Sequence, residues 1–437
     1  MALAMKPRAD AADASTLARP ARWDRTRFVA AAALAAGVGT AFIVGRDGSW
    51  LWQVIRVVAV TTLSWVVYAM ITRGVALWRG AVAFVAGCVC VAVGIGIGLP
   101  HLATSGLQPT TVAGLLAFAG GLALLAFGGV IVVRGTRRWW RVLVVPGLCA
   151  VFVVALWTLG QAVAATNVPR ASLGSTTPAD LGLSYRDVEF VTADGVTLSG
   201  WYVPSTNGAA VVLMHGSGST RSDVLDQAEV VAEHGFGVLL FDARGHGRSG
   251  GRAMDFGWYG DADTSAAVSY LQAQSDVDDE RIAAIGMSMG GEQAIGAAAA
   301  DPRIRAVIAE GATNRVAGDK GWLSEEFGWR GTVQERIEWL TYGIADVLTA
   351  ADPPITLRDA VATAAPRPVL LIVGGAIENE RLAGAYIQGG SPATVEVWVV
   401  PDTGHTAALD THPVEWEQRV IAFLTAALRP DRTEAAP

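Results

Sequence analysis

Two patterns of hydrophobic and polar positions divide the chain near residue 170. Before this point, long apolar runs alternate with short polar or basic segments. After it, short apolar runs alternate with amphipathic segments. Long runs of this kind are typical of membrane helices, and alternating strands and helices are typical of a mostly parallel sheet. The pattern therefore predicts an all-α membrane domain followed by an α/β domain.

The first part holds five apolar runs, each near the ~20 residues that a membrane helix needs. The runs are at about 28–45, 51–71, 80–99, 111–133 and 142–165. A cleaved signal peptide is the other explanation for the first run. We disfavour it because the preceding basic segment is long and four further runs follow.

Basic residues in the connecting loops predict the orientation of the spans. Residues 1–27 form a basic tail, and the loops after the second and fourth runs carry arginines. The loop Arg46-Asp47-Gly48 is nearly neutral, and the loop near 100–110 has no Lys or Arg. Basic loops stay in the cytoplasm. Five spans would then leave the N-terminus inside and the second part outside a bacterial cell membrane, whereas an even number would reverse this.

The membrane part resembles an anchor more than a transport path. Arg56 is the one ionisable residue well inside a run, near the predicted outer end where its side chain could reach the interface. Glycines such as Gly94, Gly96 and Gly98 predict close helix packing. A transporter with a fused regulatory domain is therefore disfavoured.

Charge separates the two parts further. Residues 1–170 contain 15 Lys/Arg and 4 Asp/Glu, whereas residues 171–437 contain 18 and 36. The acidic second part lacks the basic field that nucleic-acid binding requires. All three cysteines lie in the first part, so a disulfide framework or thiolate metal site in the second is excluded.

The second part begins with a linker, 166–185, and a β-hairpin around Asp194-Gly195, and we place its domain at 186–430. We predict further strands and helices in alternation. The strands are at 209–214, 236–242, 281–286, 304–309, 368–373 and 394–400, and the helices at about 222–234, 260–274, 290–300, 379–388 and 413–428. Functional residues of such sheets lie at the carboxyl ends of the strands.

The segment Gly286-Met287-Ser288-Met289-Gly290 follows one of these strands and has the G-x-S-x-G pattern of a nucleophile elbow. Ser288 would project from a sharp turn, and the flanking glycines would leave room for the reversal into a helix. A serine hydroxyl needs a base to become nucleophilic. His405, in the loop after the last strand, is the base that we predict. The other histidine after Ser288, His412, is expected at the surface or capping a helix.

Two backbone N–H groups are candidates for an oxyanion hole. The N–H of Met289 would be one, and the loop His215-Gly216-Ser217-Gly218 supplies the other. We favour Ser217 over Gly216 in that loop. The His215 side chain is expected to have a structural role.

The acid that orients His405 is the least defined member of the site. In this order of nucleophile, acid and base, it should follow a strand between Ser288 and His405. Glu378 is at the strand exit and is our first choice, with Glu380 second. Glu310 and Asp402 remain alternatives.

Two further segments have alternative interpretations. The charged stretch 242–249 could be a phosphate or metal site, but a hydrogen-bonded loop below the pocket is favoured because no second ligand cluster lies nearby in sequence. Residues 311–365 interrupt the strand–helix alternation and are rich in aromatic residues. They could form a helical cap over the site, a small core of their own, or both.

About residues 186–428 resemble the α/β-hydrolase superfamily. The resemblance rests on four segments in the family's order and spacing: His215–Gly218, Asp242–Ser249, Gly286–Gly290 and Gly404-His405. The opening Asp194-Gly195…Gly200-Trp201 is similar to that of the branch with acyl (thio)esterases, dienelactone-hydrolase-like and prolyl-oligopeptidase-like enzymes. The resemblance implies an eight-stranded sheet and no metal or organic cofactor. Glutamate in place of the usual aspartate is a departure from the pattern.

The expected function is that of a membrane-anchored serine hydrolase acting on carboxylesters or thioesters. Its partners would be the lipid bilayer and a small-molecule or lipid-like acyl substrate, and no nucleic acid. A prolyl-oligopeptidase-like peptidase and a non-catalytic sensor or scaffold with the same fold are the alternatives.

Overall fold

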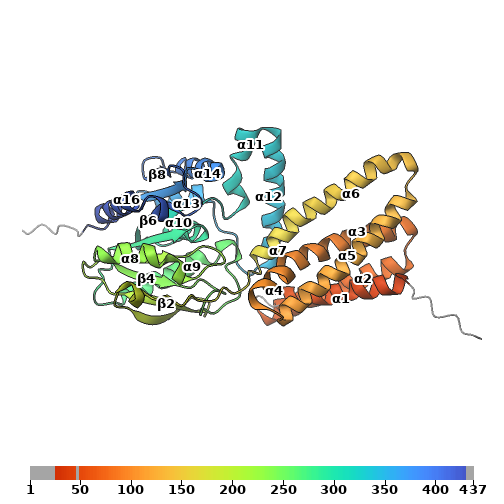
Figure 1. The fold of residues 1–437 in the computed structure, drawn as a ribbon, viewed down its shortest axis with the longest axis horizontal. Coiled ribbons are helices and arrows are strands. Elements are labelled where there is room, and N and C mark those ends of the chain that lie inside the picture. Colours follow the sequence, from red (N-terminus) through yellow and green to blue (C-terminus); the bar gives the residue numbers. More distant parts are fainter. Residues whose placement is uncertain (1–24, 46–48, 430–437) are drawn as a thin grey trace, which may run out of the picture.

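The computed structural model describes residues 25–45 and 49–429, which form a helical bundle followed by an α/β domain (Figure 1). Most of the predicted basic tail, the loop 46–48 and the chain from residue 430 lie outside the described residues.

The bundle agrees with the predicted apolar runs. Within the described residues, five helical segments are long and apolar enough to cross a membrane, which indicates membrane association. Their helices are α1 (Arg25–Val44), α2 (Trp50–Arg73), α3 (Ala76–Val93), α4 (Leu99–Ser105), α5 (Pro109–Gly135), α6 (Arg141–Ala155) and α7 (Gln161–Ala165). Short π-helical segments, Gly94–Gly98 and Leu156–Gly160, join α3 to α4 and α6 to α7.

Glycines allow the bundle helices to approach closely, as predicted. A Cβ atom on Gly98 would lie 2.8 Å from the carbonyl carbon of Gly114 in α5. A Cβ on Gly96 would lie 3.0 Å from the carbonyl oxygen of Gly160, in the last span. The backbones of the third, fourth and fifth spans therefore meet at these positions, where no larger side chain fits.

The α/β domain is built on one sheet. The described residues form eight strands in the order β1-β2-β4-β3-β5-β6-β7-β8, parallel from β4 to β8. β2 is antiparallel to both β1 and β4. The strands are β1 (Arg186–Val191), β2 (Thr197–Val203), β3 (Ala210–Met214), β4 (Gly237–Phe241), β5 (Ile282–Met287), β6 (Ile304–Glu310), β7 (Val369–Gly374) and β8 (Val395–Val400).

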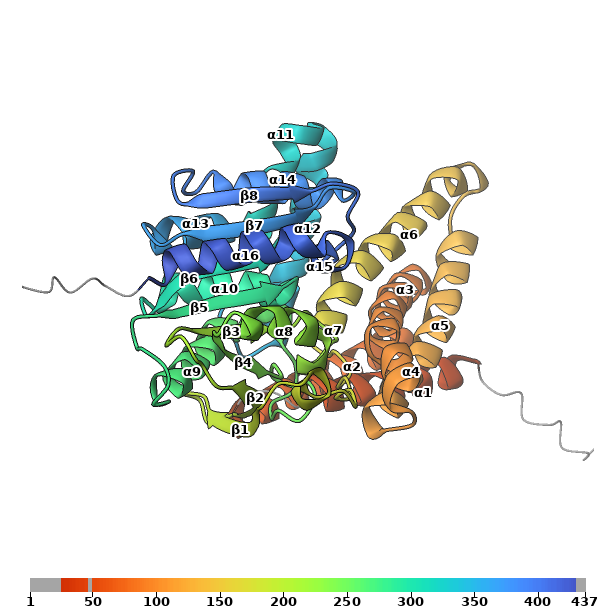
Figure 2. The same cartoon turned by 60° about the vertical axis from the view of Figure 1, so that its left-hand side comes forward.

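Helices cover both faces of the sheet (Figure 2). They are α8 (Leu225–Glu233), α9 (Gly260–Gln272), α10 (Met289–Ala300), α11 (Leu323–Phe327), α12 (Trp329–Leu348), α13 (Leu357–Ala364), α14 (Glu378–Gln388), α15 (Ala408–Thr411) and α16 (Pro413–Ala427). Side chains of α9, α10, α13 and α14 pack on one face, and those of α8, α15 and α16 on the other.

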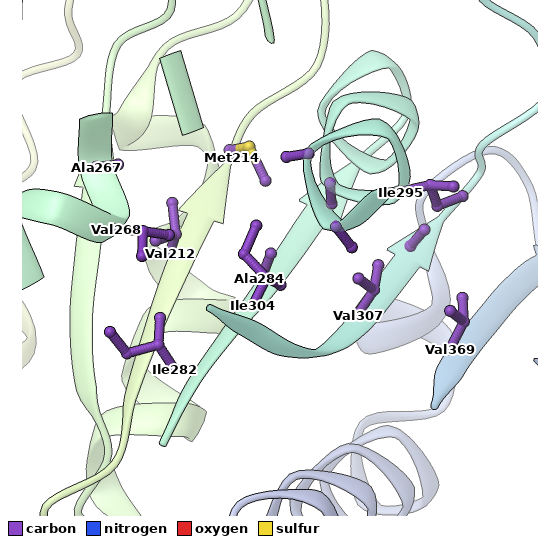
Figure 3. Packing of buried hydrophobic residues seen from close by; sticks show 14 of the residues in the cluster. Val212, Met214, Ala267, Val268, Ile282, Ala284, Ile295, Ile304, Val307 and Val369 are labelled. Atoms are coloured by element: carbon purple, nitrogen blue, oxygen red, sulfur yellow. The ribbon is translucent and has the colours of Figure 1, made fainter. Parts of the chain in front are cut away.

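The strands are apolar throughout because both of their faces are buried. Alternate side chains point to opposite faces, so Val212 and Met214 join one core while Val211 and Leu213 join the other. Figure 3 shows Val212, Met214, Ile295 and Val307 among the side chains of the first core. This double burial explains why the strands appear in the sequence as continuous apolar runs.

The segment 311–365 contains two different structures. α11 and α12 form a helical hairpin beside the bundle (Figure 1). In contrast, Leu357 and Val361 of α13 are fully buried in the main core, so α13 is a sheet-covering helix rather than part of a cap.

The carboxyl edge of the sheet faces the helical bundle. Arg252, in the segment after β4, donates to Asn167 at 3.2 Å, just beyond the last span. Thr349, in the segment after β6, accepts a 3.1 Å hydrogen bond from Arg56 of α2. Ala162 of α7 packs in a cluster with Trp258 and residues of α12. Functional residues at this edge therefore lie on the side of the domain nearest the bundle.

Candidate active site

Ser288 occupies a strained turn between β5 and α10. Its φ of 53° and ψ of −122° lie in a region that residues other than glycine rarely adopt. A Cβ on Gly286 would overlap the carbonyl group of Gly290, and a Cβ on Gly290 would lie 2.6 Å from the carbonyl oxygen of Met214. Glycine is therefore required at both positions, because neighbouring backbone atoms lie too close for a side chain. The turn that these glycines permit presents the Ser288 hydroxyl at the carboxyl edge of the sheet.

His405 lies in the loop after β8, and its Nε2 is 2.8 Å from the Ser288 Oγ. The buried Glu310, at the end of β6, holds this loop in place. Its carboxylate accepts hydrogen bonds from the Ala408 N–H at 2.9 Å and the Trp416 indole at 3.0 Å. Gly311 follows with a φ of +70°, and a Cβ there would lie 2.9 Å from the imidazole. Glu310 is thus a positioning residue for the loop.

The carboxylate that contacts His405 is that of Glu380, not Glu378. Glu380 Oε1 lies 2.6 Å from His405 Nδ1, and Oε2 accepts a 2.8 Å hydrogen bond from the Gly374 N–H at the end of β7. Glu378 is the exposed first residue of α14. Each helical residue turns by about 100°, so two residues further along the side chain points to the opposite side, into the domain. Our first choice of acid is corrected on this ground.

The remaining alternatives for the acid have other positions. Both Glu310 oxygens bond to Ala408 and Trp416, as described above. Asp402 is exposed in the loop before His405, with a φ of 51°. Within the described residues, neither carboxylate has a recorded hydrogen bond to the imidazole.

The hydrogen bond from His405 to Glu380 raises the pKa of the imidazole above its usual 6.5, against the opposing effect of partial burial. The protonated form of His405 is thereby favoured. This suits a group that accepts a proton from serine. Glu292, one turn into α10, also faces this region and is buried. Burial raises the pKa of its carboxyl to about 7, against hydrogen bonds from the N–H groups of Asn314 and Thr313.

The predicted oxyanion hole has two backbone donors near Ser288. Met289 is the first residue of α10, so its N–H has no acceptor within the helix. On the other side, a Cβ on Gly216 would lie 3.2 Å from the Ser288 Cβ. The Gly218 N–H already donates to His246 Nε2 at 3.2 Å. Gly216 and Ser217 thus remain the candidates in this loop, as in the sequence interpretation.

Two buried histidines fix the loop that carries Gly216 and Ser217. His215 Nε2 accepts from the Ala243 N–H at 2.9 Å, so its Nδ1 carries the proton and donates to the Gly216 carbonyl at 2.7 Å. His246 accepts from Gly218 and lies 2.9 Å from the Arg244 carbonyl through Nδ1. Burial lowers both pKa values, that of His215 to about 4. Both rings are therefore neutral and act as fixed hydrogen-bonding groups.

The polar side chains in the stretch 242–249 form structural hydrogen bonds and ion pairs. Asp242 accepts from the N–H groups of Arg221 and Arg248 at 2.9 Å each and forms an ion pair with the Arg221 side chain. Arg244 is buried and binds Asp263 and Asp194. Within the described residues, no group of three His, Cys, Asp or Glu could hold a metal ion. The favoured interpretation, a loop that shapes the site, is consistent with these contacts.

Sequence reasoning missed the roles of Glu292 and His246. Glu292 follows Ser288 by four residues and therefore lies on the same side of α10. Its charge, the one charged side chain in α10, was the available signal. The bond from Gly218 to His246 joins loops after two different strands, and no spacing in the sequence indicates such a pairing.

The sheet order, the elbow after β5 and the histidine loop after β8 are those of the α/β-hydrolase fold, and the predicted resemblance is confirmed. Residues 205–349 match the family model described as serine aminopeptidase, S33. This match covers the elbow and the oxyanion loop but ends before Glu380 and His405.

The chain is also similar to parts of known proteins. An uncharacterized protein of Mycobacterium tuberculosis is 42% identical over 145 residues, which are 32% of this chain and 48% of that protein. The thiohydrolase aneE of Aspergillus aculeatus is 39% identical over 134 residues, or 29% and 41% of the two chains. The Pyrococcus furiosus esterase Pf2001 aligns with a TM-score of 0.49 and 26% identity over 60% of this chain and 98% of its own. The chain spans about half the length of the first of these relatives.

Proposed function

We propose that the protein is a membrane-anchored serine hydrolase that cleaves carboxylester or thioester bonds through Ser288, His405 and Glu380. The observation that carries the proposal is the continuous hydrogen-bonded chain of these three side chains. It runs from Ser288 Oγ to His405 Nε2 at 2.8 Å and from His405 Nδ1 to Glu380 at 2.6 Å. The order along the chain, nucleophile, acid and base, is that of the α/β hydrolases.

The reaction has two stages. Ser288 Oγ attacks the carbonyl carbon while His405 Nε2 accepts its proton, and Glu380 stabilises the imidazolium. The N–H groups of Met289 and Ser217 would bind the oxyanion. When the tetrahedral intermediate collapses, His405 returns the proton to the leaving alcohol or thiol. Water, deprotonated by His405, then attacks the acyl-enzyme and releases the acid, and Ser288 regains its proton.

The position of the site favours acyl substrates that reside in or near the membrane. Arg252 and Thr349, which bond to the bundle side, belong to the segments that follow β4 and β6 at the catalytic edge. An active site at this edge faces the bilayer. The similarity to a thiohydrolase also favours thioester or ester bonds. With five spans and a cytoplasmic N-terminus, the hydrolase domain is extracytoplasmic.

Peptide hydrolysis is the second candidate because the matching family model is described as a serine aminopeptidase. The two differ in the leaving group that His405 must protonate, an amine in one case and an alcohol or thiol in the other.

Activity-based labelling tests the proposal in the full chain. A fluorophosphonate should label the detergent-purified protein, and Ser288→Ala should abolish labelling. Ser269→Ala is the matched control, since this serine lies on the exposed side of α9 and should leave labelling unchanged.

A substrate panel then separates the activities. We expect turnover of p-nitrophenyl esters and acyl thioesters to exceed that of aminoacyl p-nitroanilides. A clear preference for the anilides would replace the esterase proposal with the peptidase. Well-folded protein that neither labels nor turns over any of them would indicate a scaffold.

A further inference from the structure

The helical hairpin of α11 and α12 exposes large apolar side chains. Trp329, Val333, Leu340 and Val347, which we call the apolar stripe, follow each other at spacings of four and seven residues and therefore share one side of α12. Trp329 is 76% exposed and Val347 70% exposed. Phe327, at the end of α11, is also exposed. A contiguous apolar surface of this kind marks a contact with another apolar phase or molecule.

The opposite side of the same helix packs on the bundle. Tyr342 and Ala345 are buried in a cluster with Ala162 of the last span. Leu348 packs against the bundle core and lines a cavity of about 80 Å³ together with residues of the first, third and fifth spans. The C-terminal end of α12 is therefore fixed at the level where the spans emerge toward the hydrolase domain.

The direction of α12 differs from that of the spans. Figure 1 shows that α12 crosses the end of the bundle next to α7, and that α11 and α6 extend away from this point in different directions. Most side chains of α6 are exposed and apolar, as expected of a lipid-facing helix. Because Leu348 packs on the bundle core, the end of the apolar stripe at Val347 thus lies at the hydrolase end of the bundle.

Two features of the hairpin favour a membrane interface over a protein partner. Tryptophans are enriched at the level of lipid headgroups, and Trp329 and Trp339 are both exposed. Arg330 and Arg336 lie on the exposed part of α12 and are suited to lipid phosphates. If the five helices span a membrane, a second copy of the chain would have to cover the stripe next to the end of the last span, where lipid would lie.

We propose that the α11–α12 hairpin is a monotopic membrane element, with the apolar stripe seated in the interfacial region of the bilayer on the hydrolase side. Its partner is the lipid surface itself. The hairpin then adds a second attachment beside the five spans and holds the catalytic edge against the bilayer. The inference assumes that the five helices span the membrane but does not require hydrolase activity.

Depth-dependent fluorescence quenching tests this inference in the full chain reconstituted in lipid nanodiscs. Single cysteines replace Val333 or Val347 in a background in which the exposed Cys149 is changed to serine, while Cys88 and Cys90 stay buried. Each cysteine is labelled with the environment-sensitive dye NBD. Val151→Cys, on the exposed surface of α6, is the membrane control, and Ala426→Cys, on the exposed last turn of α16, is the aqueous control.

We expect blue-shifted emission at positions 333 and 347 and at least twofold stronger quenching by lipids with a spin label near the headgroup than at position 426. Quenching at 151 but water-like signals at both 333 and 347 would overturn the inference while leaving the spans intact. Blue-shifted emission that depends on protein density and resists lipid quenching would assign the stripe to a second copy instead. Two labelled positions guard against a local folding defect in one variant.

Discussion

At the scale of single residues, the contact between Glu380 and His405 decides how the site would respond to pH. Because the hydrogen bond to Glu380 is the largest cause of the raised pKa of His405, its loss should return that pKa toward the usual value. His405 must be neutral to accept a proton, so activity falls as the pH drops through its pKa. The acidic limb of the rate profile therefore reports this contact.

We predict that Glu380→Gln lowers kcat for ester hydrolysis roughly 10²- to 10⁴-fold, by analogy with loss of the acid in other triads. The acidic limb of kcat/KM should also move to lower pH. Glu378→Gln is the matched control, two residues away and exposed, and should leave both quantities unchanged. A strong loss in the control with a near-normal Glu380→Gln enzyme would restore the first choice from the sequence.

A second residue-scale prediction concerns Glu292. Its pKa is raised from 4.5 to about 7 by burial, so the folded state binds a proton that the unfolded state releases. This contribution to stability is present below pH 4.5 and is lost as the pH rises through about 7. The expected slope is about 1.4 kcal/mol per pH unit in that window.

Unfolding of the wild-type protein and of Glu292→Gln, measured in the same detergent between pH 5 and 8, checks this prediction. The wild-type stability should fall more steeply with rising pH, because glutamine does not titrate. Parallel curves for the two proteins would show that Glu292 has an ordinary pKa.

The roles of single residues were only partly predictable from the sequence. Ser288 and His405 were identified because an elbow needs glycines at fixed spacing and because few histidines follow it. The choice between Glu378 and Glu380 depends on which side of α14 faces His405. The sequence pattern of a short helix does not fix how the helix is rotated about its axis. The bond from the buried Glu380 to Gly374 shows that tertiary packing makes this choice.

At the scale of elements, the close contact between α11 and α12 depends on Gly331. A Cβ at this position would overlap the carbonyl oxygen of Leu323 in the facing helix. We therefore predict that Gly331→Ala destabilises the protein by about 1–3 kcal/mol, because the hairpin must open to accommodate the methyl group.

Gly343→Ala is the matched control for this change. Gly343 lies on the exposed side of the same helix, and no described atom lies within 4 Å of its ideal Cβ. Alanine should there be neutral or stabilise the helix by up to ~1 kcal/mol. The melting temperatures of both variants in one detergent test the pair, and equal shifts would mean that the hairpin contact does not limit stability.

Most elements were predictable because each has one simple pattern. The spans are long apolar runs. The strands are short apolar runs, because both faces of the sheet are buried. The hairpin in 311–365 has no such pattern, since α12 places Tyr342 against the bundle while Trp329 and Val347 are exposed. Apolar residues on several sides of one helix obscure its periodicity. The helix α13 was missed for a different reason, because its eight residues are too few for a strong signal.

At the scale of the whole molecule, the number of spans determines where the site operates. Five spans place Arg25, at the start of α1, and the hydrolase domain at opposite ends of the bundle. Basic loops between the spans favour a cytoplasmic N-terminal end. The catalytic edge would then face the outer leaflet, and under the proposed function an acyl substrate would come from that leaflet or from outside the cell.

Reporter fusions test this arrangement directly. Alkaline phosphatase, which is active only outside the cytoplasm, should be active when fused after residue 437 and after residue 107, between the third and fourth spans. It should be inactive after residue 137, in the basic loop between the fourth and fifth spans, where β-galactosidase should be active instead. Active β-galactosidase after residue 437 would place the hydrolase domain in the cytoplasm. The hairpin and the catalytic edge would then face the inner leaflet, because both are fixed to the same end of the bundle by Arg56 and Ala162.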